Sequence, residues 1–326
     1  ATLKKTMHHL FVIDPNLTQY PFEGLLKSKI KRLGKKINDL TTTPVTTELE
    51  SGAIISWIAC ADGASTFKIH TLIRKGIAGI VKENPAEISI SFFGNAISDQ
   101  WVESAVYVVL ANSQPLPNLK KASKYSLLKK LSLVGVAKRS LSDTVALVNG
   151  NTLTRHLTIT PPNQLTPTHY KTHIKKLAKQ HKWTYKEYNM AQLKKMGAGA
   201  FVAVGQGSEP QDAAIVHLKY TTKAAKKTIA LVGKGICFDT GGHNLKPAKY
   251  MSGMHEDMNG SAVALGILQV ASESKLPINI DCWLAIAQNH IGPKAYKQND
   301  VIAALNGMTI EIVHTDAEGR MVLADT

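Results

Sequence analysis

The pattern of apolar and polar residues predicts the secondary structure of the first part of the chain. Some apolar runs are continuous and others alternate with polar residues. Strands are expected over residues 9–13, 53–58 and 88–93, where β-branched and aromatic residues predominate, and a helix over 126–133. No motif with catalytic chemistry occurs in this part. The pattern predicts a small α/β domain over residues 1–145.

Residues 146–326 show a repeated strand-and-helix pattern, and Pro161, Pro162 and Pro167 mark its entrance. The elements expected are helices over 169–180, 190–196 and 261–271 and strands over 183–188, 213–217, 228–232 and 278–287. The alternation predicts a second α/β domain with a mixed, mainly parallel sheet.

Two patterns in the second domain predict how strands pair. The run 228–232 is continuously aliphatic, which is typical of a central strand buried on both faces. Asn306-Gly307 lies between two short strand-like runs and predicts a hairpin with a type I′ turn, in which both central residues have positive φ.

The composition is that of an ordinary folded protein. Of 326 residues, 44% are hydrophobic and 19% charged, which suffices for two domains with buried cores. No apolar stretch is long enough to cross a bilayer and the first residues lack a signal-peptide core, so we expect no membrane association and a cytoplasmic location. The three cysteines form no CxxC pair, which predicts neither disulfides nor a thiolate zinc site.

The net charge of +15 includes basic clusters over residues 27–36, 120–139 and 171–186. Such clusters can form a surface for polyanions such as DNA. The lysines recur on helix-like faces with few aromatic residues between them, which favours solvated exterior faces instead. DNA binding is therefore expected only as an added role.

The first candidate chemistry lies where a strand runs into a glycine-rich loop over residues 231–242, which carries Lys234 and Asp239. Ligands of open α/β sheets bind beyond the carboxyl ends of such strands. A phosphate-binding P-loop is excluded because Lys234 is followed by glycine and Thr228 stands at the first glycine position. The isolated Gly205-Gln206-Gly207 is equally poor as a dinucleotide motif.

Carboxylates recur at two further places near the ends of predicted elements. Glu256-Asp257 precedes the helix expected from Ser261, where a carboxylate taken alone is more typical of an N-terminal cap. The segment 316–320, Asp-Ala-Glu-Gly-Arg, follows an apolar strand and holds two carboxylates two residues apart. A turn with a surface salt bridge is the simple interpretation of that segment.

Four carboxylates and three cations thus fall near strand ends of one domain: Asp239, Asp257, Asp316 and Glu318 with Lys234, Lys246 and Arg320. Hard oxygen ligands of this kind suit Zn²⁺, Mn²⁺ or Mg²⁺, and four of them can hold two dications. No HExxH motif occurs, so a single-zinc site on a helix is excluded.

These motifs resemble those of the M17 leucyl aminopeptidase family. The family's NTDAEGR signature corresponds to residues 314–320, and its VGKGxxFDxGG signature to residues 232–242. The family lysine and aspartate that follow correspond to Lys246 and Asp257, without insertion. The resemblance covers about residues 153–326, so residues 146–326 are expected to be the catalytic domain and residues 1–145 the variable N-terminal domain.

The resemblance implies a role for each matched residue. Five are expected to bind two divalent ions, zinc or manganese with magnesium and cobalt as further candidates: Lys234, Asp239, Asp257, Asp316 and Glu318. Lys246 is expected to stabilise the oxyanion, and Arg320 to hold a bicarbonate ion that shuttles the proton. Because an amine binds metal only when neutral, a dication must lower the pKa of Lys234.

The activity implied is metal-dependent hydrolysis of the N-terminal residue of peptides, preferably leucine or another apolar residue, by a metal-activated water. A homohexamer is implied as well. The alternatives are a two-metal phosphoesterase and a DNA-binding protein that retains the fold. Blocking the substrate amine should abolish aminopeptidase turnover but not phosphate ester cleavage. DNA binding should weaken steeply with added salt and survive loss of the metals.

Two positions depart from the family pattern: His314 replaces an asparagine and Met321 a leucine. His314 lies beside the expected ligand loop and can alter hydrogen bonds there. His243 and His255 lie near the motifs, but we do not expect either to touch substrate. The family's catalytic domain continues past the position of Thr326, so the chain is expected to lack a C-terminal part.

Overall fold

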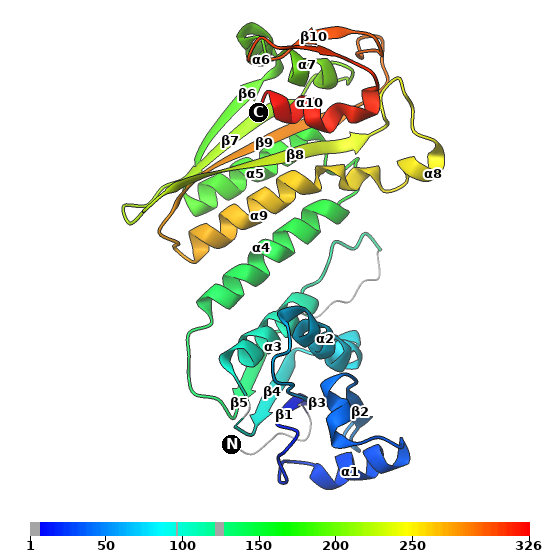
Figure 1. The fold of residues 1–326 in the computed structure, drawn as a ribbon, viewed down its shortest axis with the longest axis vertical. Coiled ribbons are helices and arrows are strands. Elements are labelled where there is room, and N and C mark those ends of the chain that lie inside the picture. The colour runs from blue at the N-terminus through cyan, green and yellow to red at the C-terminus, as the bar shows by residue number, and fades with distance from the viewer. Residues whose placement is uncertain (1–6, 96, 121–126) are drawn as a thin grey trace. The chain divides into compact units, whose positions relative to one another are not determined.

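The chain divides into two compact units, residues 1–148 and 149–326. The structure, a computed structural model, describes residues 7–95, 97–120 and 127–326 (Figure 1). Helix α4 (Ser142–Ile159) contains the boundary between the units. Each unit has its own hydrophobic cores and is described by itself.

The first unit is built on a five-stranded sheet in the order β2-β3-β1-β4-β5. Strands β1 (His8–Ile13), β3 (Ile54–Ala59), β4 (Glu87–Phe93) and β5 (Lys130–Val134) are parallel, and β2 (Val45–Glu48) is antiparallel to β3. The helices are α1 (Glu23–Arg32), η1 (Ile37–Thr41), α2 (Thr66–Lys82) and α3 (Asp99–Asn112).

Alternate side chains of β1 enter two different cores of the first unit. Leu10 and Val12 pack with α2 and α3, whereas Phe11 and Ile13 pack with α1. This is the period of two expected for a strand with both faces covered. The cores explain why the continuous apolar run over residues 9–13 is a central strand.

The helix predicted over residues 126–133 is wrong. Ser126 lies outside the described residues, residues 127–129 have no regular structure, and Lys130–Val134 form β5 beside β4. Leu131 and Leu133 both pack against the core with α2 and α3. Alternate positions therefore face inward, and the run was too short to separate a strand period from a helical one.

The second unit has a four-stranded sheet in the order β6-β7-β9-β8 and a separate two-stranded hairpin. The strands are β6 (Thr184–Asn189), β7 (Ala214–Tyr220), β8 (Thr228–Asp239), β9 (Asn279–Asn289), β10 (Val301–Ala303) and β11 (Thr309–Glu311). Besides α4, the helices are α5 (Pro167–His181), α6 (Met190–Met196), α7 (Gly199–Gly205), α8 (Ala248–Met251), η2 (Met254–Met258), α9 (Asn259–Glu273), η3 (Thr315–Ala317) and α10 (Glu318–Ala324).

Helices cover both faces of the four-stranded sheet (Figure 1). On one face, Val216 and Leu218 of β7 pack with residues of α5 and α9. On the other, Ile215 packs with residues of α6, α7 and α10. Packing on the two faces fixes the elements whose ends carry the polar motifs of the sequence.

The predicted α/β class with mixed sheets is confirmed. The parallel majority, however, lies in the first unit: in the second, β8 pairs in parallel with β9, while β9 with β7 and β7 with β6 are antiparallel. Among the described residues, no helix is both long and apolar enough to cross a bilayer.

One prediction about strand pairing is wrong, and a second is right about the hairpin but wrong about its turn type. Residues 228–232 lie at the sheet edge rather than its centre, and Val232 is 50% exposed; aliphatic composition specifies a strand but not its neighbours. The β10–β11 hairpin exists, but only Gly307 has positive φ. Hydrogen bonds join Gly307 N to Ala304 O at 2.8 Å and Ala304 N to Met308 O at 2.8 Å, a three-residue loop with glycine in the left-handed position.

Candidate metal centre

The parallel strands β8 and β9 end side by side and deliver the first two polar residues of the site. Asp239 pairs in register with Asn289, after a bulge between Ile236 and Asp239. Both side chains are buried, with 2% and 1% exposure. A bulge at this point re-aims the last side chain of β8, which places the Asp239 carboxylate beyond the strand end.

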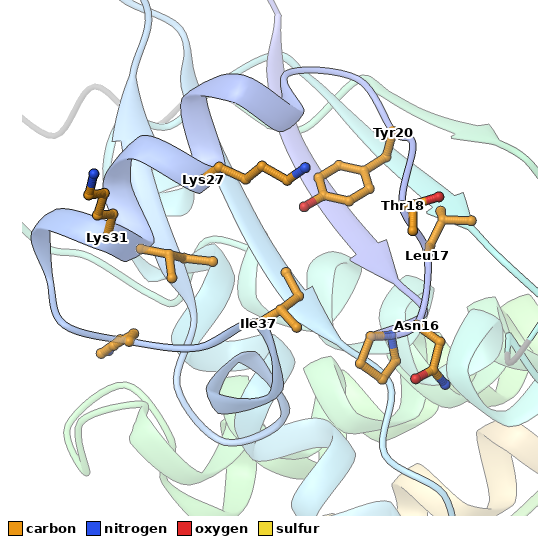
Figure 2. A pocket seen from close by; sticks show the side chains of 10 residues that line it. Asn16, Leu17, Thr18, Tyr20, Lys27, Lys31 and Ile37 are labelled. Carbon is orange, nitrogen blue, oxygen red and sulfur yellow. The ribbon is translucent and has the colours of Figure 1, made fainter.

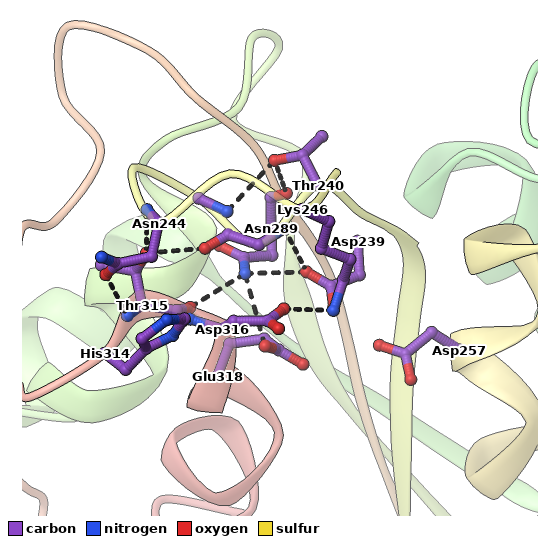
Figure 3. A network of polar contacts seen from close by, with 12 residues as sticks. Asp239, Thr240, Asn244, Lys246, Asp257, Asn289, His314, Thr315, Asp316 and Glu318 are labelled. Atoms are coloured by element: carbon purple, nitrogen blue, oxygen red, sulfur yellow. Dashed lines mark hydrogen bonds and ion pairs between the residues drawn. The ribbon is translucent and has the colours of Figure 1, made fainter. Parts of the chain in front are cut away.

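Asn289 is the shared hydrogen-bond donor of the site, and sequence reasoning missed it. Its Nδ2 lies 2.8 Å from Asp239 Oδ1, 3.1 Å from the Thr315 carbonyl and 3.4 Å from Glu318 Oε2 (Figure 3). One amide thus links a strand end to the segment 315–318. Its place directly after the apolar run 278–287, at a carboxyl strand end, is the sequence signal that could have found it.

Thr315 joins the glycine loop to the 316–320 segment. Its Oγ1 donates to the Gly241 carbonyl at 2.6 Å, its backbone N donates to Asn244 Oδ1 at 2.8 Å, and its carbonyl accepts from Tyr296 at 2.6 Å. Asn244 N in turn donates to Thr315 Oγ1 at 2.9 Å. Since Thr315 is fully buried, these bonds fix the position from which the next residues enter the site.

Two glycines of the motifs allow these close approaches. Gly242 has φ of +69°, and a Cβ there would lie 2.9 Å from Thr315 Oγ1 and 3.1 Å from Asn289 Oδ1. A Cβ on Gly319 would lie 3.0 Å from Lys234 Nζ. Any larger residue at either position would have to displace a polar side chain of the site.

Three carboxylates converge on one point. Asp239, Asp316 and Glu318 each offer an oxygen, and these oxygens all lie within 4.8 Å of one another. Glu318 is 1% exposed, and Asp316 is partly buried. Placing three negative charges together away from water costs free energy unless cations compensate them.

Lys246 supplies one compensating cation. Its Nζ lies 3.0 Å from Asp239 Oδ2 and also pairs with Asp316 Oδ1. Burial alone lowers the pKa of Lys246, but the hydrogen bonds to Asp316 and Asp239, together with their charges, outweigh it and raise the pKa. The amine is therefore protonated and can donate hydrogen bonds.

Lys234 supplies a second cation on the other side of the cluster. Its Nζ lies 2.7 Å from Asp257 Oδ2 and 2.7 Å from Glu318 Oε1. Burial lowers the pKa of Lys234, but its bonds to both acids prevail and raise it. Burial, aided by the charges of Glu318 and Asp239, raises the pKa of Asp257 to about 6 against the opposing effect of Lys234.

The two simple interpretations of these acids are wrong. Asp257 does not cap α9, whose N-cap residue Met258 has no side-chain cap bond; it faces Lys234 instead. Asp316 pairs with Lys246, and Glu318 is buried against Lys234, so the 316–320 segment is not a turn with a surface salt bridge.

Of the seven residues singled out from the sequence, the structure brings six together. Arg320 is exposed on α10, and its guanidinium forms no ion pair with a described carboxylate. His243 is exposed and His255 partly buried, and within the described chain neither bonds to the cluster. His314 Nδ1 accepts a hydrogen bond from the Asp316 backbone N–H at 3.1 Å, so this histidine holds the backbone of the 316–320 segment.

The residues present fit a divalent metal. Their donors are carboxylate oxygens of Asp239, Asp316 and Glu318, which hard and borderline dications prefer. Asn289 Oδ1 is buried and has no hydrogen-bond partner within the described residues, which leaves one more oxygen beside the cluster. The three acids can therefore bind a cation. The protonated lysine amines beside them can donate hydrogen bonds to an anionic or carbonyl oxygen.

Comparison with known proteins gives matches over this part of the chain. The model of the cytosol aminopeptidase family, catalytic domain, matches residues 152–326. A probable cytosol aminopeptidase of Pseudomonas fluorescens (strain SBW25) is 42% identical over 205 residues, which cover 61% of this chain. The chain spans only 41% of that relative's length.

Solved structures share the fold over almost the whole chain. The cytosol aminopeptidase of Coxiella burnetii has a TM-score of 0.78 at 26% identity, covering 99% of this chain and 68% of that one. The bottromycin maturation enzyme BotP in complex with Mn has a TM-score of 0.79 at 23% identity, covering 97% of this chain and 67% of that one. At 23% identity, the likeness to BotP shows a shared fold.

Proposed function

The chain belongs to the cytosol aminopeptidase family, because the family's model matches more than half of the chain, and we propose that the protein is a metal-dependent aminopeptidase. The family membership confirms the resemblance that the motifs implied. The observation that carries the proposal is the convergence of Asp239, Asp316 and Glu318 within 4.8 Å, between two lysines. The proposed reaction releases the N-terminal residue of a peptide.

Five residues are proposed to hold two dications, zinc or manganese: Lys234, Asp239, Asp257, Asp316 and Glu318. Support comes from the contacts of Lys234, whose amine already lies between two of these acids. When bound, such ions supply positive charge that polarises a carbonyl and lowers the pKa of water. Proton release from Lys234 must accompany its proposed role as a ligand.

Lys246 is proposed to stabilise the oxyanion. Its side chain is 14% exposed and its pKa is raised, since bonds to Asp316 and Asp239 outweigh burial, so a protonated amine lies at the edge of the cluster. Metal ions that take over the two carboxylates would leave its N–H groups free to donate to a carbonyl oxygen. A hydrogen-bond donor that is already placed where negative charge develops lowers the activation free energy by about 3 kcal/mol.

Arg320 is proposed to hold an anion, bicarbonate, that moves the proton. It lies two residues after Glu318 on α10 and is exposed, so its guanidinium is available to a planar carboxylate-like ion. Asn289 and Thr315 are proposed to hold Asp239 and the 316–318 segment in place. These two act by positioning and need not touch the substrate.

The substrate and assembly follow from the family. We propose peptides with a free N-terminal amine and an apolar first residue, preferably leucine, together with a homohexamer and a cytosolic location. A free amine is proposed because its lone pair could bind one of the two ions, which an acylated nitrogen would do poorly.

Hydrolysis of leucine p-nitroanilide with added Mn²⁺ tests the proposal. Wild-type protein should release the arylamine, and N-acetyl-leucine p-nitroanilide should stay intact. Asp316→Asn should lose at least about 100-fold in rate. Asp281→Asn, which changes an acid of β9 outside the cluster, is the matched control and should keep the rate. Equal rates in Asp316→Asn and wild type would contradict the proposed site.

A further inference from the structure

The first unit contains a cavity of about 530 Å³ beyond the carboxyl end of β1 (Figure 2). It is formed by the loop after β1, the helix α1 and the turn that leads into η1. The lining residues are Pro15, Asn16, Leu17, Thr18, Tyr20, Lys27, Ile30, Lys31, Lys35 and Ile37. Its volume falls within the range of about 300–1,000 Å³ that small-molecule sites occupy.

The sheet has a topological switch point between β1 and β4. β1 and β4 are parallel neighbours, but the connection after β1 leads to β2 and β3 on one side, and the connection after β4 leads to β5 on the other. Ligands of open α/β sheets bind outside the carboxyl ends of strands at such a point. The cavity adjoins this point on the β1 side, since its lining residues all lie between Pro15 and Ile37.

The charge of the lining is positive. Lys27, Lys31 and Lys35 belong to it, and no acidic residue does. Lys27 pairs with Glu23 one helical turn away, whereas Lys31 and Lys35 form no ion pair with a described acid. The surrounding residues 23–36 hold six basic side chains and one acidic, so the local field attracts anions.

The rest of the lining is suited to a flat organic group. Leu17, Ile30 and Ile37 are apolar, and the partly buried phenol ring of Tyr20 lies beside the Lys27 amine (Figure 2). Asn16 and Thr18 are exposed and offer an amide and a hydroxyl. A phosphate alone would use the lysines but leave the aromatic and apolar surface unused.

We propose that this cavity binds a phosphorylated small molecule with a planar ring, of the nucleotide class. The phosphate pairs with Lys27 beside Tyr20 and is attracted by the charges of Lys31 and Lys35; the Lys31 amine points away from Tyr20 in the structure (Figure 2). The ring packs against Tyr20, Leu17 and Ile37. Lysines of the 27–36 cluster, expected from the sequence to be a solvated face, then serve as an anion site. The site is separate from the metal cluster, since its residues belong to the other unit.

Calorimetric titration of the full chain in EDTA with AMP, ADP, adenosine and inorganic phosphate tests this proposal. EDTA removes dications, so binding through the metal centre does not contribute. A nucleotide should bind at least about tenfold more tightly than adenosine or phosphate, because only it uses both the cations and the ring. Equal affinity for phosphate and nucleotide would overturn the proposal.

Charge-matched variants separate the cavity from general attraction. Lys27→Gln/Lys31→Gln should weaken nucleotide binding at least about tenfold, and Tyr20→Ala should weaken nucleotide more than phosphate. Lys68→Gln/Lys75→Gln removes the same charge from the exposed face of α2 and should change affinity less than about twofold. Far-ultraviolet circular dichroism checks the fold. Equal weakening by both lysine pairs, or no nucleotide binding at millimolar concentration, contradicts the proposal.

Discussion

The Lys234 amine lies 2.7 Å from the carboxylate of Glu318, and Glu318 is 1% exposed. A lysine of the edge strand β8 thus neutralises a buried acid at the start of α10. The same amine is proposed as a metal ligand, which requires a lone pair and hence loss of its proton. Charge compensation and metal ligation make different demands on this side chain, and substitution can separate them.

Lys234→Arg keeps the positive charge but cannot lose its proton. If Lys234 is a ligand, this variant should stay folded and bind the ion at this position at least about tenfold more weakly. Lys234→Met should in addition lose about 1.5–3 kcal/mol of metal-free stability, since Asp257 and Glu318 lose their donor. Metal titration by calorimetry and urea unfolding measure both. Wild-type metal affinity in Lys234→Arg would contradict the ligand role.

Asn289→Ala should loosen the cluster without removing any carboxylate. The variant deprives Asp239, Glu318 and the Thr315 carbonyl of a buried donor, so a loss of about 1–3 kcal/mol of stability is expected, with weaker metal binding. The exposed Asn38→Ala serves as control. Urea unfolding measures the loss of stability, and metal titration measures the loss of affinity. An Asn289→Ala variant as stable as the control would show that the amide does not position the acids.

Gly242→Ala tests close approach at the glycine loop. Gly242 and Gly34 have similar positive φ, +69° and +63°, but only Gly242 would place a Cβ against other atoms, 2.9 Å from Thr315 Oγ1. Gly34→Ala should cost about 1 kcal/mol for the backbone alone. Gly242→Ala should cost clearly more and weaken metal binding, as thermal unfolding and metal titration will measure. Equal costs for both would remove the steric argument.

His181 should make stability depend on pH. Burial lowers its pKa, and Glu273, 4.0 Å away, opposes this only in part. The unfolded chain therefore binds a proton more readily, so this contribution is present above the ordinary histidine pKa of about 6.5 and is lost as pH falls from there through the lower pKa of the folded protein. Urea unfolding at several pH values should show a smaller decrease in His181→Gln. An unchanged pH dependence would contradict the assignment.

The sequence predicted the four main strands of the second unit and the helices α5, α6 and α9, because each has a clear apolar pattern, but it did not predict α4, α7 or α8. It predicted the carboxylates and lysines because they stand in motifs with fixed spacing. It could not predict that β8 lies at an edge or that residues 130–134 pair with β4, since neighbours in a sheet are set by tertiary contacts.

Asn289 shows the same limit for the site. It belongs to no motif, and its importance arises because β9 ends beside β8 and directs an amide at Asp239. Asp257, by contrast, was singled out from the sequence, but taken alone its position before α9 favoured a helix cap. Only the three-dimensional structure brings Lys234 within 2.9 Å of its Oδ1, 23 residues away.

The most direct test of the central claim is a titration of Mn²⁺ into EDTA-treated protein, with bound metal and leucine p-nitroanilide hydrolysis measured on the same samples. The account predicts no hydrolysis without metal, activity that rises with occupancy, and saturation near two ions per chain. Hydrolysis that persists in EDTA, or full metal occupancy without release of the arylamine, would contradict it.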